Sequence, residues 1–104
     1  MNVKGSLNAL ILQNLSRGSN HGYRIAQEIK QKSKGILDFK EGTLYPALHG
    51  LEANGLITSF TEEKDGRSRC CYKLTEKGRK ALAHEKQQWS QFSSAINLIL
   101  QEAS

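Results

Sequence analysis

The sequence predicts a mainly α-helical fold with a small β-hairpin and a long C-terminal helix. Apolar residues recur three and four positions apart in residues 7–15, 21–33 and 41–54, which is the spacing of an amphipathic helix. Residues 56–63 and 68–74 are rich in the residue types that favour strands. After residue 75, apolar residues repeat every seven positions, which favours a helix with a narrow apolar seam. A chain of 104 residues, 38% hydrophobic and 24% charged, fits one folded domain.

The first two helices are predicted over residues 7–15 and 21–33. Gly18-Ser19-Asn20 separates them, and Asn20 is predicted to be the N-cap of the second helix. Gly35 ends that helix. The apolar residues of the first helix are Leu7, Leu10, Ile11, Leu12 and Leu15, and the predicted buried face of the second consists of Tyr23, Ile25, Ala26 and Ile29.

A third helix is predicted to begin near residues 41–43 and to run to Asn54. Pro46 is expected close to the helix start, where its missing N–H costs little. Asn54-Gly55 is a left-handed stop signal. The apolar stripe of this helix consists of Leu44, Ala47, Leu48 and Leu51.

The two predicted strands are joined by Lys64-Asp65-Gly66-Arg67, in which Asp-Gly supplies the positive φ angles of a tight hairpin turn. Because side chains alternate along a strand, the second strand has two distinct faces. Cys70, Tyr72 and Leu74 share one face, and Arg67, Arg69, Cys71 and Lys73 share the other.

The last helix is predicted to begin after its N-cap, Thr75, and to continue to about residue 101. Its seven-residue repeat predicts an apolar seam for another helix, so we expect a homodimer. The seam consists of Leu82, Trp89, Phe92, Ile96 and Ile99 and continues to Ala103, with Glu85 as an exception. Packing of part of the seam on the first helix of the same chain is the alternative.

Three helices followed by a hairpin form the element order of a winged helix-turn-helix. Residues 1–74 would be this DNA-binding domain, and residues 75–104 a C-terminal dimerisation helix within the same structural unit. In this fold the third helix enters the major groove and the hairpin reaches phosphates or the minor groove. Helical geometry places Gly42, Pro46, His49, Gly50 and Ala53 on the outward face, flanked by Thr43 and Tyr45.

Few of these outward residues can read base edges by hydrogen bonding: Thr43, Tyr45 and His49. Two alternatives are open, because Tyr45 could equally belong to the core or contact a phosphate, and His49 could simply face solvent. Four basic residues are predicted to contact DNA from the hairpin, namely Lys64, Arg67, Arg69 and Lys73. A merely solvated hairpin face is the alternative.

The charge distribution also favours a polyanionic partner. The formal net charge is +5, with +6 in residues 1–80 and −1 in residues 81–104. The start of the chain lacks the pattern of a signal peptide, and no apolar run approaches the roughly 20 residues of a membrane span. We therefore expect a cytoplasmic protein without a membrane partner.

Catalysis is not expected. His21, His49 and His84 lie on different predicted helices and have no partner residue at a telling spacing. Cys70 and Cys71 are adjacent, too few for a structural zinc site and strained as a disulfide, so we interpret them as reduced thiols. No metal or cofactor is expected. Two rival functions are a winged-helix module that binds only protein and an RNA-binding domain, although no strand has the exposed aromatic cluster that stacks RNA bases.

The sequence resembles the PadR family of transcriptional regulators over nearly its whole length. The similarity lies in residues 21–23, 41–52, 54–57 and 72–79, and the Gly-Thr-Leu-Tyr-Pro run of residues 42–46 is its most specific motif. The short length resembles the family's compact branch, which has a single C-terminal helix. The resemblance implies a homodimeric repressor that binds an inverted-repeat operator and is released by a small molecule or a stress signal.

With the resemblance, the predicted DNA-contacting residues are Tyr23, Thr43, Tyr45, Pro46, His49, Lys64, Arg67, Arg69 and Lys73. The sequence departs from the family at Gly50, where members often have a basic residue, and at Cys70-Cys71, where they often have Lys-Tyr. The first departure weakens the expected contact of the third helix with DNA, and the second removes a positive charge from the hairpin.

Trp89 and Phe92 lie one helical turn apart. In a two-fold dimer these rings would be duplicated, so we expect them to flank a pocket for a small planar apolar effector. An interface anchor without a cavity is the alternative for Trp89.

Overall fold

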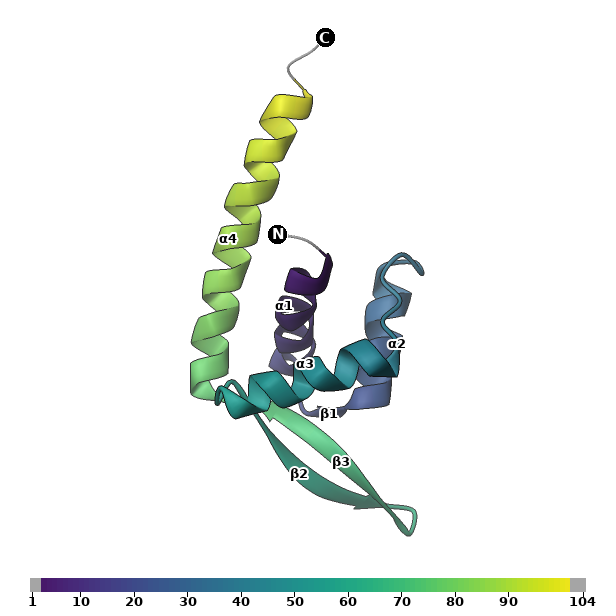
Figure 1. Ribbon diagram of the computed structural model, residues 1–104. Helices are drawn as coiled ribbons and strands as arrows, with labels where there is room; N and C mark the ends of the chain where they lie inside the picture. The colour runs from purple at the N-terminus through teal and green to yellow at the C-terminus, as the bar shows by residue number, and fades with distance from the viewer. Residues whose placement is uncertain (1–2, 102–104) are drawn as a thin grey trace.

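A computed structural model describes residues 3–101. The elements are α1 (Val3–Ser16), β1 (Asn20–His21), α2 (Gly22–Lys32), α3 (Glu41–Ala53), β2 (Ile57–Lys64), β3 (Arg67–Leu74) and α4 (Glu76–Leu100). Figure 1 shows α1, α2 and α3 forming a body from which α4 and the β2–β3 hairpin, here called the wing, project in different directions. The predicted winged helix-turn-helix with a long C-terminal helix is confirmed.

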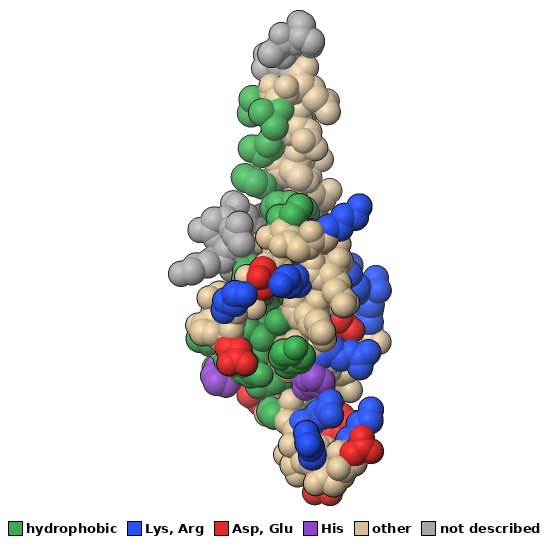
Figure 2. All heavy atoms as spheres, turned by 90° about the vertical axis from the view of Figure 1, so that its right-hand side faces the viewer, with side chains coloured by type: hydrophobic (Ala, Val, Ile, Leu, Met, Phe, Trp, Pro, Cys, Tyr) green, Lys and Arg blue, Asp and Glu red, His purple; other side chains and the backbone are tan. Residues whose placement is uncertain are grey.

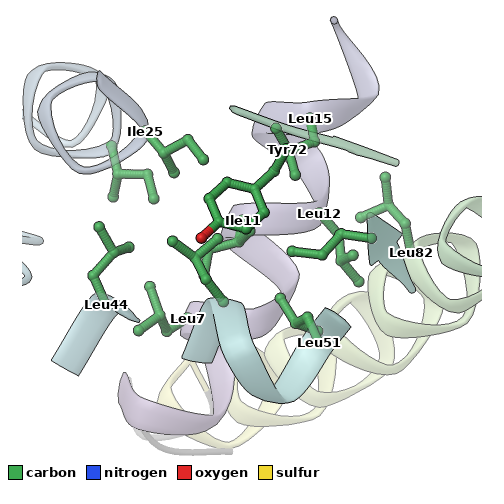
Figure 3. Packing of buried hydrophobic residues seen from close by; sticks show 12 residues of the cluster. Leu7, Ile11, Leu12, Leu15, Ile25, Leu44, Leu51, Tyr72 and Leu82 are labelled. Atoms are coloured by element: carbon green, nitrogen blue, oxygen red, sulfur yellow. The ribbon is translucent and has the colours of Figure 1, made fainter. Parts of the chain in front are cut away.

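The core lies where the three helices meet the root of the wing. The apolar residues that were predicted from helical spacing supply most of it, and the ring of Tyr72 lies among them (Figure 3). Burial raises the pKa of the Tyr72 hydroxyl to about 12. The buried residues are Leu7, Ile11, Leu12, Leu15, Ile25, Ile29, Leu44, Leu48, Leu51, Ile57, Tyr72 and Leu82.

The start of α2 differs from the prediction. Asn20 is not the N-cap, because it belongs to the two-residue strand β1, which pairs with β3 through Asn20↔Tyr72 and His21↔Cys71. The Asn20 side chain instead donates to Asn14 Oδ1 at 2.9 Å and to Glu28 Oε1 at 3.1 Å. His21 caps the helix, with Nδ1 accepting from the backbone N–H of Arg24 at 3.4 Å.

Tyr23 was predicted to be buried, and this is wrong. Its side chain is 65% exposed, whereas Gly22, Ile25 and Ile29 form the buried stripe of α2. Close packing fixes this rotation of the helix, since a Cβ on Gly22 would lie 2.8 Å from the hydroxyl oxygen of Tyr45. The small residue therefore faces α3, and its larger neighbour turns outward.

The position of Pro46 also differs from the expectation. Pro46 is the sixth residue of α3 and lies beyond the first turn. In that turn the backbone N–H groups of Thr43 and Leu44 both donate to the carbonyl of the N-cap, Lys40. The carbonyl of Gly42 therefore does not receive the usual helical bond from residue 46. Gly42 is exposed, so water can satisfy that carbonyl.

The predicted turns are confirmed. Gly55 has a φ of 75° after α3, and the wing turns through Asp65 and Gly66 with φ values of 55° and 75°. The sheet has the order β1-β3-β2, so the predicted hairpin gains one short strand at its root.

The base of α4 is attached to the segment between α3 and β2. Thr75 is the N-cap as predicted: its hydroxyl accepts from Gly78 N at 3.0 Å and donates to the carbonyl of Gly55 at 2.7 Å. Lys77 Nζ donates to the carbonyl of Asn54 at 2.9 Å. A Cβ on Gly78 would overlap the carbonyl oxygen of Leu56. The first turns of α4 are therefore held closely against the end of α3.

Candidate DNA-binding surface

The outward face of α3 is as the sequence predicts. Gly42, Pro46, His49, Gly50 and Ala53 are exposed, and Thr43 and Tyr45 are half-buried at its margins. These exposed residues include no acidic, Lys or Arg side chain, and several are small. Such a face can approach the floor of the major groove closely, but it offers few side chains for reading bases.

Tyr45 has a mixed environment. Its ring packs against the core and over Gly22, and its centroid lies 6.4 Å from that of His49. The rings of Tyr45 and His49 are therefore neighbours on α3. Tyr23 and Tyr45 both line a cavity of about 500 Å³ between α2 and the start of α3, so the structure brings the two predicted tyrosines to one region.

The four basic residues of the wing lie on one face. The strand register pairs Lys64 with Arg67, Glu62 with Arg69, and Thr58 with Lys73, and residues directly opposite each other share a face. Figure 2 shows Lys and Arg side chains gathered at the lower end of the molecule among acidic ones. The sequence reasoning missed Glu62, which brings a carboxylate to the basic face.

The Glu62 side chain forms a hydrogen bond with Cys71 at the root of the wing. The Cys71 thiol is buried and donates to Glu62 Oε2 at 3.2 Å, while Cys70 is exposed. Burial, and then the Glu62 carboxylate, raise the pKa of Cys71 to about 11. Cys71 therefore remains a protonated thiol at neutral pH and is a poor nucleophile.

The described residues contain no group of three or more His, Cys, Asp and Glu side chains placed to hold a metal ion. No helix in this part of the chain combines the length and apolar composition needed to cross a membrane.

A second surface lies along α4. Leu82 belongs to the core of its own chain, so the exposed part of the predicted seam begins at Trp89. Beyond it, hydrophobic side chains follow one side of the projecting helix (Figure 2). Ala103 lies outside the described residues. The exposed apolar residues are Trp89, Phe92, Ile96, Leu98, Ile99 and Leu100.

An apolar groove lies between α1 and α4. It has a volume of about 730 Å³ and includes Leu10, Leu37, Leu82 and Trp89 among its lining residues. The rings of Trp89 and Phe92 lie 6.0 Å apart, tilted by 38°. Trp89 therefore does border a cavity, whereas Phe92 lies beside Trp89 outside the groove lining.

The comparisons with known proteins agree with this fold. Residues 11–84 match the model of the transcriptional regulator PadR-like family. The chain belongs to the PadR-like family.

Individual relatives of this PadR-like chain extend the similarity. A transcriptional regulator of Mycobacterium tuberculosis is 38% identical over 76 residues, covering 73% of this chain and 68% of the relative. A transcriptional regulator of Clostridium thermocellum superimposes with a TM-score of 0.87 at 30% identity, covering 98% of this chain and 94% of the other.

A PadR family transcription regulator of Clostridium difficile gives a TM-score of 0.83 at 33% identity, covering 92% of this chain and 99% of the other. This PadR-like chain is accordingly a DNA-binding transcription regulator and not an enzyme.

Proposed function

We propose that this PadR-like regulator is a repressor that binds an inverted-repeat operator as a homodimer and is released by a ligand or a stress signal. The observation that carries the proposal is the pairing of two surfaces on one chain. The outward face of α3, which has no acidic, Lys or Arg side chain, occurs together with a basic face on the wing, and α4, with its exposed apolar side, projects away from both.

Base reading is assigned to α3. Thr43 and His49 have hydrogen-bonding groups on or beside its outward face, where they would meet base edges in the major groove. Pro46 would pack against sugar or base atoms, because it has no N–H to donate. Tyr23 and Tyr45 line one cavity. Their hydroxyl groups would donate hydrogen bonds to the phosphates that flank the groove.

Phosphate contacts are assigned to the wing, through Lys64, Arg67, Arg69 and Lys73. These contacts fix the position of the protein on the duplex, and each makes the affinity more sensitive to salt. Glu62, on the same face and opposite Arg69, would repel phosphates. The negative charge of Glu62 would therefore weaken the phosphate contact of its neighbour Arg69 more than the contacts of the other basic residues of the wing.

Homodimer formation is supported by the exposed part of α4. Trp89, Phe92, Ile96 and Ile99 are 39–65% exposed and lie on one side of the helix. Monomeric soluble proteins rarely expose an apolar stripe of this kind, and a second copy would bury it. A two-fold dimer would present two α3 helices to the two halves of a palindromic site. A dimer lying over a promoter represses by occupying the DNA that RNA polymerase needs.

Release by a ligand is supported by the groove beside Trp89. Its volume of about 730 Å³ falls within the range of small-molecule sites, and the indole ring suits a planar apolar molecule. A ligand that binds one dimer arrangement better than the other would change the spacing of the α3 helices. Saturable quenching of Trp89 fluorescence by planar aromatic compounds, together with release of DNA, is the expected result. A broad panel that does neither would remove the effector from the proposal.

The experiment that tests DNA recognition is a footprint on the DNA upstream of the protein's own gene. We expect two protected half-sites related by two-fold symmetry, with centres about one helical turn of DNA or a multiple of it apart. Protection of a single unrepeated site would contradict the homodimeric mode. Uniform weak protection of all sequences would contradict sequence-specific recognition.

A further inference from the structure

Glu52, in the last turn of α3, holds the first strand of the wing. Its Oε2 atom accepts a hydrogen bond from the backbone N–H of Ser59 at 3.1 Å and another from the Ser59 hydroxyl at 2.5 Å. One carboxylate oxygen therefore connects the helix assigned to base reading with the hairpin assigned to phosphate contact. Bonds to a charged acceptor are roughly twice as strong as neutral ones.

Ser59 lies at the root of the free part of the wing. The strand order β1-β3-β2 leaves β2 paired only with β3, so one edge of β2 has backbone groups without a neighbouring strand. The backbone N–H of Ser59 lies on that edge, where it donates a hydrogen bond to the Glu52 carboxylate. Ile57 is buried and Thr58 half-buried, but every residue from Ser59 to Lys64 is exposed. Glu52 thus binds the strand at the point where it leaves the core.

The wing is long enough that a small change in its angle to α3 moves its tip by a large distance. Lys64 is five residues beyond Ser59, about 17 Å along a strand. A rotation of about 10° at the root would displace the tip by about 3 Å, which is the length of a hydrogen bond. Lys73 pairs with Thr58, beside the root, so the same rotation would hardly move it.

We propose that Glu52 is a positioning residue that sets the angle between α3 and the wing, so that the wing tip reaches DNA phosphates while α3 occupies the groove. This rests on the proposed contacts of α3 and the wing with one DNA duplex. Glu52 acts through Ser59 and does not touch DNA, because phosphates repel a carboxylate. Its substitution should therefore remove the contacts of distant wing residues and preserve those near the root.

The test is a set of double-mutant comparisons between Glu52→Ala and two wing variants, Arg67→Ala at the tip and Lys73→Ala at the root. The probe is a fluorescein-labelled duplex of mixed sequence, since phosphate contacts do not require an operator. The slope of log affinity against log salt concentration is measured by anisotropy for each variant. In the wild-type background, each wing variant should reduce the slope by about one unit.

In the Glu52→Ala background, Arg67→Ala should no longer change the slope, whereas Lys73→Ala should still reduce it. If Arg67→Ala lowers the slope equally in both backgrounds, Glu52 does not position the wing. If neither wing variant changes the slope even in the wild-type background, the proposed wing contact is itself wrong. These two failures are therefore distinguishable.

Folding is checked by circular dichroism and by the thermal unfolding midpoint. Should Glu52→Ala fail to fold, Ser59→Ala replaces it in the same comparisons, because it removes the hydroxyl bond and keeps the backbone N–H. The expected result is then a partial loss of the Arg67 effect with the Lys73 effect unchanged. Full retention of both effects in Ser59→Ala would overturn the proposal in that case.

Discussion

Gly78 and Gly50 are helical glycines in opposite environments. A Cβ on Gly78 would overlap the carbonyl oxygen of Leu56, whereas a Cβ on Gly50 would meet no atom within 4 Å. We expect Gly78→Ala to lower the free energy of unfolding by about 1–3 kcal/mol, because α4 must move away from Leu56. Gly50→Ala should raise it by about 0.5–1 kcal/mol, because alanine favours a helix.

Thermal unfolding of both variants at one protein concentration checks these signs. The concentration must be matched because association stabilises the folded chain. The midpoint should fall for Gly78→Ala and rise for Gly50→Ala. An unchanged midpoint for Gly78→Ala would show that α4 does not need the close approach to Leu56.

His21 gives the protein a pH dependence near neutrality. Burial, and then the charges of Arg69 and Arg24, lower the pKa of His21 below 6.5, against smaller opposite effects of Glu62 and Glu28. The unfolded chain therefore binds more protons around pH 6, so stability should fall as the pH decreases from about 7.5 to about 5.5. Protonation of Nδ1 would also remove the acceptor that caps α2.

The matched variant is His21→Asn, because asparagine caps a helix but does not titrate. Denaturant unfolding at several pH values should show a smaller loss of stability for this variant between pH 7.5 and 5.5. His49 and His84 are present in both proteins, so their contributions cancel. Equal losses in the two proteins would assign the pH dependence to other groups.

At the scale of the elements, α3 and the wing should respond differently to substitution. His49→Ala or Thr43→Ala should relax sequence preference at one or two base pairs of each half-site, with little change in salt dependence, because these side chains are assigned to base edges. Binding to a set of operator variants measures this preference. A change in salt slope without a change in preference would reassign the residue to phosphate contact.

The elements with strong local signals were predictable from the sequence. Asp65-Gly66 and Asn54-Gly55 fixed two turns, because few residues adopt positive φ without strain. Helical periodicity gave the core residues of α1 and α3. The outward face of α3 followed from the same periodicity, so much of the candidate site was predictable as well.

The elements that depend on distant partners were not predictable. β1 has two residues, too few for a pattern, and forms only because β3 lies beside it. That pairing, with the bonds to Asn14 and Glu28, takes Asn20 away from the capping position that its residue type favours. Glu52 and Glu62 were missed for the same reason, since each meets its partner through the fold rather than along the helix or strand.

At the scale of the whole molecule, the chain is less compact than a single globular domain. Its radius of gyration is 15.5 Å and its longest dimension 60 Å, whereas about 13 Å is typical of a globular domain of this length. The projecting part of α4 and the wing, which extend in different directions from the helical body, account for the difference (Figure 1). The large apolar side chains of α4 from Trp89 onward are 39–73% exposed in the described chain.

Ile96→Glu should therefore convert dimers into monomers that bind DNA poorly, because it places a charge within the apolar side of α4. Ser94→Glu is the matched control, since Ser94 is exposed on the same helix and lies about 160° around the helix axis from Ile96. Sedimentation should show monomers only for Ile96→Glu. Dimers of unchanged stability in that variant would remove α4 from the interface.

In the proposed homodimer, the projecting helix would also make gene control sensitive to the abundance of the protein. The DNA-binding form then requires two chains to meet, so at low abundance its amount rises with the square of the chain's abundance. Halving the protein, as happens to a stable pool at each cell division without new synthesis, would cut that form by about fourfold. A regulator that bound as a single chain would lose only half. An exposed stripe of tryptophan, phenylalanine and isoleucine side chains would thus let dilution by growth switch a gene more sharply than the affinity of one chain for DNA allows.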